Sequence, residues 1–177
     1  MLASSNRSIV ANFFTPSYRV LGRAFVGSSG LIGALNDPNV SHIEVAEASM
    51  ARLHEPKTIA DRTNEIRVVK RGLVVIALGR DTDVGPQTIA RGGFGRVSRY
   101  PLRVVTSSFE MEGELEWSGR FEVAVLLMEG GEFFPLYNAS LRAIHYPDLN
   151  LKSPALLINR RKIDIVRMLE RTSDAGS

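Results

Sequence analysis

The chain of 177 residues contains no cysteine, which excludes a disulfide framework, thiolate zinc sites and cysteine nucleophiles. It also lacks long apolar runs. The stretch from Ile9 to Phe14 is too short for the core of a signal peptide, and no segment approaches the roughly 20 apolar residues that a membrane helix needs. From these absences we expect a cytoplasmic protein without a membrane partner.

Sequence motifs of common catalytic sites are also missing. There is no G-x-S-x-G nucleophile elbow, no H-E-x-x-H zinc helix, and neither the Walker lysine nor a full G-x-G-x-x-G spacing. The sequence therefore favours a protein that is not an enzyme and indicates no cofactor, but it does not specify a biochemical activity.

The composition itself is that of an ordinary folded protein. Apolar residues make up 44% and charged residues 23%, which is typical of a chain that buries a core. The net charge of +3 comes from 22 basic and 19 acidic residues, spread along the chain rather than gathered on one element. Nucleic-acid binding proteins more often concentrate their basic residues.

Two segments of the sequence each occur in two similar copies, and the copies follow the same order along the chain. Residues 48–56 read ASMARLHEP and residues 139–147 read ASLRAIHYP, an offset of 139 − 48 = 91. Further on, VVKRGLVVIA at 68–77 resembles LINRRKIDIV at 157–166, and aligning Arg71 with Arg160 gives an offset of 89. Two ordered matches at nearly equal spacing predict an internal duplication.

Each copy is expected to hold about five short strands and one short helix. Residues 42–48 and 132–139 alternate between apolar and polar side chains, as half-buried strands do, and residues 101–117 have the pattern of a hairpin. A second hairpin with an arginine-bearing turn closes each copy. Residues 119–129 favour one or two helical turns ending at Gly130-Gly131, with a buried strand as the alternative.

These elements predict a mainly β protein with two small antiparallel, partly open barrels of SH3-like or Sm-like size, packed about a pseudo-twofold axis. Barrels of this kind hide the apolar face and the edges of a small sheet. The predicted organisation is an N-terminal tail (1–16), a first β repeat (17–79), a linker (80–99), a second β repeat (100–170) and a C-terminal tail (171–177).

One group of motifs resembles a family of uncharacterised bacterial tandem small β-domains. The motifs are Leu35-Asn36-Asp37, a strand ending at Ala48, an arginine-bearing turn, and the final strand Val74-Val75-Ile76. The second copy departs from this pattern, because it reads Leu126-Leu127-Met128 at the first motif. The resemblance implies the fold class and no activity.

Four repeated residues are candidates for binding. His54 and His145 recur in the repeated segment and could converge to bind a metal together with Glu55, although a histidine that caps a strand end explains them more simply. Arg71 and Arg160 recur in the closing hairpins and could contact phosphate or a carboxylate. Exposed arginines are, however, common in such turns.

A further candidate for binding, besides the histidine pair and the arginine pair, is the segment ARGGFGRVSRY at residues 90–100, most of which lies in the predicted linker. Its residues Arg91, Phe94 and Arg96 combine positive charge with an aromatic ring, a composition that can bind single-stranded nucleic acid. A solvated linker explains the same composition.

Three functions follow from these patterns. The first is a non-catalytic binding or scaffold protein that acts through a protein partner or as a homo-oligomer, because edge strands need to be covered. The second is an Sm-like or OB-like nucleic-acid-binding module, by fold analogy. The third is a small-ligand binder or enzyme with its site between the repeats.

Overall fold

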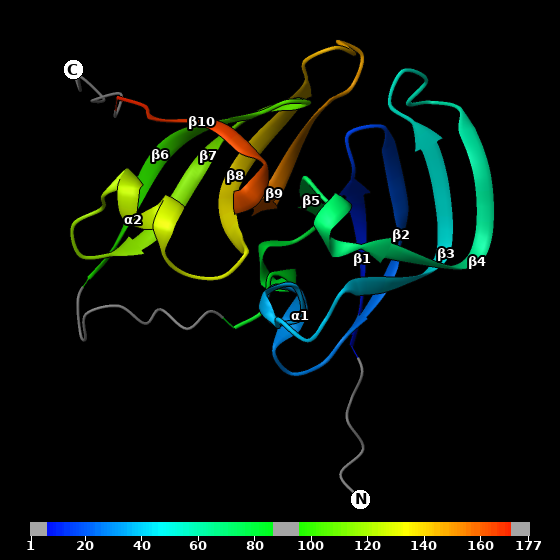
Figure 1. Ribbon diagram of the computed structural model, residues 1–177, viewed down its shortest axis with the longest axis horizontal. Helices are drawn as coiled ribbons and strands as arrows, with labels where there is room; N and C mark the ends of the chain where they lie inside the picture. Colours follow the sequence, from blue (N-terminus) through cyan, green and yellow to red (C-terminus); the bar gives the residue numbers. More distant parts are fainter. Residues whose placement is uncertain (1–6, 87–95, 171–177) are drawn as a thin grey trace, which may run out of the picture.

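The computed structural model describes residues 7–86 and 96–170. Its ten antiparallel strands form one sheet in the order β10-β6-β7-β8-β9-β5-β1-β2-β3-β4 (Figure 1). Two short helices and three 3-10 turns join them. With 58% of the described residues in strands, the prediction of a mainly β, antiparallel protein is confirmed.

The elements follow the same order in the two halves of the chain. The N-terminal half contains β1 (Arg7–Phe14), β2 (Tyr18–Val26), α1 (Gly30–Asn36), β3 (His42–Arg52), β4 (Ile59–Val69), the turn η1 (Lys70–Gly72) and β5 (Val75–Leu78). The turn η2 (Asp81–Asp83) follows. The C-terminal half contains β6 (Val97–Thr106), β7 (Phe109–Ser118), α2 (Val123–Met128), β8 (Phe133–Ala143), β9 (Asn150–Asn159), η3 (Arg160–Lys162) and β10 (Ile163–Met168).

The strand registers of the two halves correspond residue by residue. Tyr18 pairs with Arg52, and adding 91 to each number gives Phe109 and Ala143, which also pair. From β4 onwards the offset is 90, because His42 pairs with Val69 whereas Phe133 pairs with Asn159 (133 − 42 = 91 and 159 − 69 = 90).

This register corrects the sequence alignment of the closing hairpins. With an offset of 90, Arg160 corresponds to Lys70 and not to Arg71, so the predicted offset of 89 is wrong by one residue. The backbone agrees: the N–H of Lys70 donates to the carbonyl of Ser41 at 2.9 Å, and the N–H of Arg160 donates to that of Glu132 at 2.8 Å.

Both halves bend at the same place in the sheet. The register shifts in β2 against β3 at Gly22 and in β7 against β8 at Gly113, and the opposite strands carry Glu47 and Asn138 at φ values of 50° and 47°. A Cβ atom on Gly22 would lie 2.9 Å from the carbonyl oxygen of Ala46, and one on Gly113 would lie 2.8 Å from that of Tyr137. Each β-bulge therefore requires a glycine opposite it.

The predicted domain boundaries change at two points. Residues 1–16 were expected to be a tail, but Arg7–Phe14 form β1, which pairs with both β2 and β5. Residues 80–99 were expected to be a linker, but β6 begins at Val97. The expected helical turns in 119–129 are confirmed as α2.

The sheet runs without interruption from one half to the other, in place of the two separate barrels that the sequence predicted. Residues Val75–Leu78 of β5 pair with Ala155–Ile158 of β9, and we call this junction the seam. The sheet is not closed. Because β5 and β9 occupy different positions in their halves, the pseudo-twofold arrangement is wrong: a twofold axis would bring equivalent surfaces together.

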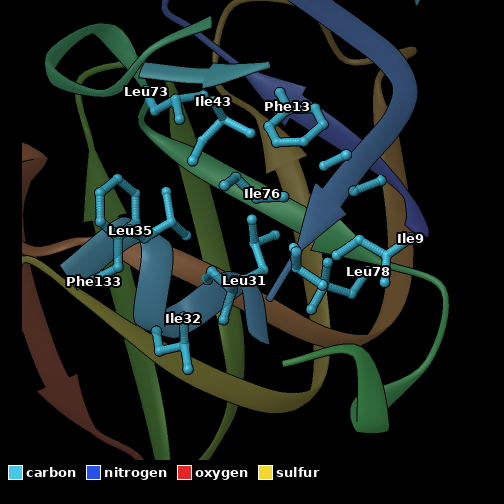
Figure 2. Packing of buried hydrophobic residues seen from close by; sticks show 14 of the residues in the cluster. Ile9, Phe13, Leu31, Ile32, Leu35, Ile43, Leu73, Ile76, Leu78 and Phe133 are labelled. Atoms are coloured by element: carbon cyan, nitrogen blue, oxygen red, sulfur yellow. The ribbon is translucent and has the colours of Figure 1, made fainter. Parts of the chain in front are cut away.

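Two clusters of buried side chains lie on opposite faces of the sheet at the seam. Ile76 and Leu78 belong to the first cluster, which the N-terminal half mainly forms, and Val75 and Ala77 belong to the second, which the C-terminal half mainly forms. Figure 2 shows Phe133, from the C-terminal half, beside Leu35 of α1 in the first cluster. The seam strands are thus buried on both faces, which explains their continuous apolar sequence.

Candidate interaction site: the seam and the outer edges

An ion pair between largely buried groups links the two halves beside the seam. The ammonium Nζ of Lys70 lies 3.5 Å from the carboxylate Oε2 of Glu132 and donates to the carbonyl oxygen of Asp37 at 2.9 Å. A buried ammonium group is costly unless such partners surround it. The pair therefore favours this one arrangement of the halves.

The side chain of Asn36 links the helix α1 to the opposite half by hydrogen bonds. Asn36 Nδ2 donates to the carbonyl oxygen of Phe133 at 3.0 Å, and the backbone N–H of Phe133 donates to Asn36 Oδ1 at 2.7 Å. The amide of Asn36 thus satisfies both backbone groups of the first residue of β8, as a neighbouring strand would.

Polar side chains also close both ends of the seam. At one end, Asn159 Nδ2 donates to the carbonyl oxygen of Leu73 at 2.9 Å. At the other, Ser153 Oγ lies 2.8 Å from the carbonyl oxygen of Leu78 and 2.7 Å from that of Ala155. Both side chains are buried, so their hydrogen bonds are costly to lose.

The outer edges of the sheet are the strands β4 and β10. Within the described residues β4 pairs only with β3, and β10 pairs only with β6 (Figure 1). By the offset of 90, β4 corresponds to β9 and β10 corresponds to β5. The two strands that meet at the seam therefore each have a counterpart at an outer edge.

Side chains at the outer edges differ in exposure from their counterparts. Ile165 of β10 is 59% exposed, whereas its counterpart Val75 is 0% exposed. Ile144, which follows β8, is 40% exposed, whereas its counterpart Leu53 is 1% exposed. Val75 and Leu53 are buried by the second cluster across the seam. At the outer edges the same positions thus leave apolar surface in contact with water.

Charged residues accompany these apolar side chains. Arg67 of β4 lies 3.6 Å from Glu44 and 3.4 Å from Glu65, and β10 carries Asp164 and Arg167. Charges on an edge strand oppose uncontrolled pairing with other chains. The outer edges thus carry charges that the paired residues of the seam lack.

A cavity of about 380 Å³ lies where the halves meet, in the size range of small-molecule sites. It is lined by residues of α1, β7, α2, β8 and η3. Its lining includes Asn36 and Ile32 from the N-terminal half, and Trp117, Phe134, Glu129 and Arg160 from the C-terminal half. The chain's single tryptophan thus lies between the halves.

The two candidate histidines both lie near the ring of Tyr146. The ring centroids of His54 and His145 are 6.3 Å and 6.4 Å from that of Tyr146. Both histidines are exposed, and they lie in the turns after β3 and β8. Among residues 7–86 and 96–170, no group of three potential ligands is close enough together to hold a metal ion.

The structure separates the candidate arginines. Arg71 is exposed in η1, whereas Arg160 lines the cavity beside Gly130. In the linker motif, Arg91 and Phe94 lie outside the described residues, and Arg96 is exposed just before β6. These residues do not form one common site in the part of the chain that the structure describes.

A ladder of arginine–glutamate pairs covers one exposed area of β6, β7 and β8. Arg99 contacts Glu116 at 3.0 Å and Glu114 at 3.2 Å, and the hydrogen bond that Arg99 donates to Glu116 is the main cause that raises the pKa of Arg99. Arg103 and Arg142 contact Glu110 in the same way. Their charges are neutralised, which weakens the attraction of this area for phosphates. Nucleic-acid binding stays a prediction.

None of the helices in the described residues has both the length and the apolar character that crossing a membrane requires. Comparisons of the chain with known protein-family models, curated proteins and solved structures gave no match. The site is therefore interpreted from its own geometry.

Sequence reasoning singled out residues that are identical in the two copies and missed those that differ at corresponding positions. Asn36, Val75 and Leu53 are buried or bonded at the seam, whereas their counterparts Leu127, Ile165 and Ile144 are exposed. The outer surface could have been found by comparing the two copies and looking for apolar residues at equivalent, outward-facing positions.

Proposed function

We propose that this protein is a scaffold that self-associates through its β-sheet. The observation that carries the proposal is the seam, where a strand edge of one half binds a strand edge of the other. Each of these edges has a counterpart at the outside of the same molecule, where no second strand of the described residues pairs with it. Unpaired strand edges are ready-made sites for pairing with another chain.

The distribution of exposed apolar side chains supports the same function. Ile165 and Met168 of β10 are exposed, as is Ile144 after β8, while Ile59 and Val69 are exposed on β4. Association of two chains would remove such surface from water. The charges on both strands make that association reversible.

Sedimentation velocity over a wide range of protein concentrations tests this function. The expected result is a mean mass that rises with concentration as chains associate. A single species with the mass of one chain at every concentration would contradict the proposal.

A second candidate function is the binding of a small molecule in the cavity between the halves. It is favoured by the cavity's size and by a lining that combines the aromatic rings of Trp117 and Phe134 with the charge of Arg160. Trp117 provides the probe: a ligand that enters the cavity changes tryptophan fluorescence and raises the melting temperature. A metabolite screen with no change in either quantity would contradict this candidate.

A further inference from the structure

We infer that the partner surface is a second copy of this chain docked head to tail, with β10 of one copy pairing antiparallel with β4 of the next. This inference rests on the proposed self-association and specifies the contact. At the seam the C-terminal half offers β9 to β5 of the N-terminal half. A second copy would offer β4, the counterpart of β9, to β10, the counterpart of β5.

The seam fixes the register of this contact. Val75 pairs with Ile158 and Leu78 pairs with Ala155. Adding 90 to the β5 residues gives Ile165 and Met168, and subtracting 90 from the β9 residues gives Val68 and Glu65. The intermolecular pairs are therefore Ile165 with Val68 and Met168 with Glu65.

The apolar side chains fit this register. Val75 reaches across the seam into the second cluster, which includes Ile158. In the same manner Ile165 would reach towards Val68, which lies in the first cluster of the next copy. The exposed area of Ile165 would then become buried, as that of Val75 already is.

A hydroxyl group on β4 matches the polar end of the seam. Ser153 Oγ contacts both the carbonyl oxygen of Ala155 and that of Leu78. Its counterpart Thr63 (153 − 90 = 63) has the first of these contacts, because Thr63 Oγ1 donates to the carbonyl oxygen of Glu65 at 3.0 Å. The contact of Ser153 with the carbonyl oxygen of Leu78 would have its counterpart in a contact of Thr63 with the carbonyl oxygen of Met168 in the docked copy.

Other differences make the intermolecular contact weaker than the seam. Glu132, which pairs with Lys70, has the uncharged Ser41 as its counterpart (132 − 91 = 41). The apolar Leu157 has the charged Arg67 as its counterpart, while Leu156 has the apolar Ile66. The seam also gains from the covalent link between the halves. We therefore expect association that depends on concentration.

The contact is heterologous, because each copy uses a different surface on each side. Repetition of such a contact closes into a ring or continues as an open chain, depending on the rotation between copies. Both assemblies require the same pairing of β10 with β4.

Engineered disulfides test the register, and the absence of native cysteine makes the result unambiguous. One variant carries Val68→Cys and a second carries Ile165→Cys; the two are mixed and oxidised. Residues directly opposite in antiparallel strands have Cα atoms about 4.5 to 5.5 Å apart, within the range that a disulfide spans. The matched control replaces Val68→Cys with Arg67→Cys.

The inferred register predicts disulfide-linked heterodimers for the pair at 68 and 165 and few for the pair at 67 and 165. This order is the reverse of what accessibility alone would give, because Val68 is buried and Arg67 is exposed. Equal yields from the two pairs, a higher yield from the control, or no heterodimer in either mixture would overturn the inference.

A charged substitution at the contact tests the head-to-tail pairing separately from self-association itself. Ile165→Glu should weaken association about tenfold or more, because it places a carboxylate in an apolar contact. The matched control Val10→Glu alters a residue of β1 that is also half exposed, and it should leave association unchanged. Equal melting temperatures of both variants and the original chain show that each has folded.

If the original chain associates and Ile165→Glu associates equally well, the head-to-tail contact is wrong while self-association stands. If the original chain stays monomeric at every concentration, both are wrong.

Discussion

The seam and the outer edges use the same strand geometry with different side chains. At the seam, Val75–Leu78 and Ala155–Ile158 are all apolar and buried. The corresponding residues outside, 165–168 and 65–68, include Arg167, Glu65 and Arg67. Backbone pairing is available at both places, so the side chains decide whether the junction is permanent or reversible.

The largest contrast is expected between Leu157→Ala and Arg67→Ala, which alter corresponding positions. Leu157 is buried in the first cluster, so its truncation should lower the free energy of unfolding by about 2 to 5 kcal/mol. Arg67 is exposed, and its truncation should change that free energy by no more than about 0.5 kcal/mol. Urea denaturation measures both. Similar losses would show that the seam contributes nothing beyond an ordinary edge.

The two β-bulges should respond alike to substitution. Gly22→Ala and Gly113→Ala each bring a Cβ atom within 3.0 Å of a backbone carbonyl oxygen, which has little room to move. Each should lower the free energy of unfolding by about 1 to 3 kcal/mol. A clear loss in one half and none in the other, measured by chemical denaturation, would break the correspondence between the halves.

Asn36→Ala and Met128→Ala test the contact between helix and strand. Asn36 makes two hydrogen bonds to the backbone of Phe133, so its loss should cost about 2 kcal/mol. Met128 is the last residue of α2, as Asn36 is the last residue of α1, and it is 83% exposed. In dilute solution, Met128→Ala should leave the melting temperature unchanged. A larger loss from Met128→Ala than from Asn36→Ala would contradict this comparison.

The smallest difference in stability is expected between variants that remove the hydroxyl groups of Ser153 and Thr63. Ser153→Ala removes a buried hydrogen bond at the seam and should cost about 1 kcal/mol. Thr63→Ala, at the corresponding partly exposed position, should lower the free energy of unfolding of the monomer by less and should weaken association. Denaturation at low concentration and sedimentation at high concentration separate these two effects.

Much of the secondary structure could be predicted from the sequence, because each strand and helix carries its own local pattern. The repeated Ala-Ser motif gave the correct offset of 91 through β2 and β3. The strand β1 was missed because Val10 is apolar and yet exposed, so the alternation of Ile9, Ala11 and Phe13 is hidden. The closing hairpins were misaligned by one residue because an identical arginine was matched instead of a position in the turn.

The seam could not be predicted, because its strands are nearly 80 residues apart in the chain (155 − 78 = 77). The apolar sequence of β5 indicates a strand buried on both faces but does not name its neighbour. The seam also determines which outer edges remain open. The candidate interaction site was therefore beyond a reading of local pattern.

Amide hydrogen exchange in β5 tests the continuous sheet most directly. Because β5 pairs with β1 on one side and with β9 on the other, all four amides from Val75 to Leu78 should exchange slowly, as in a central strand. If the halves were separate barrels, every second amide of β5 would face solvent and exchange as fast as those on the open edge of β4. That alternating result would contradict the seam and, with it, the head-to-tail contact.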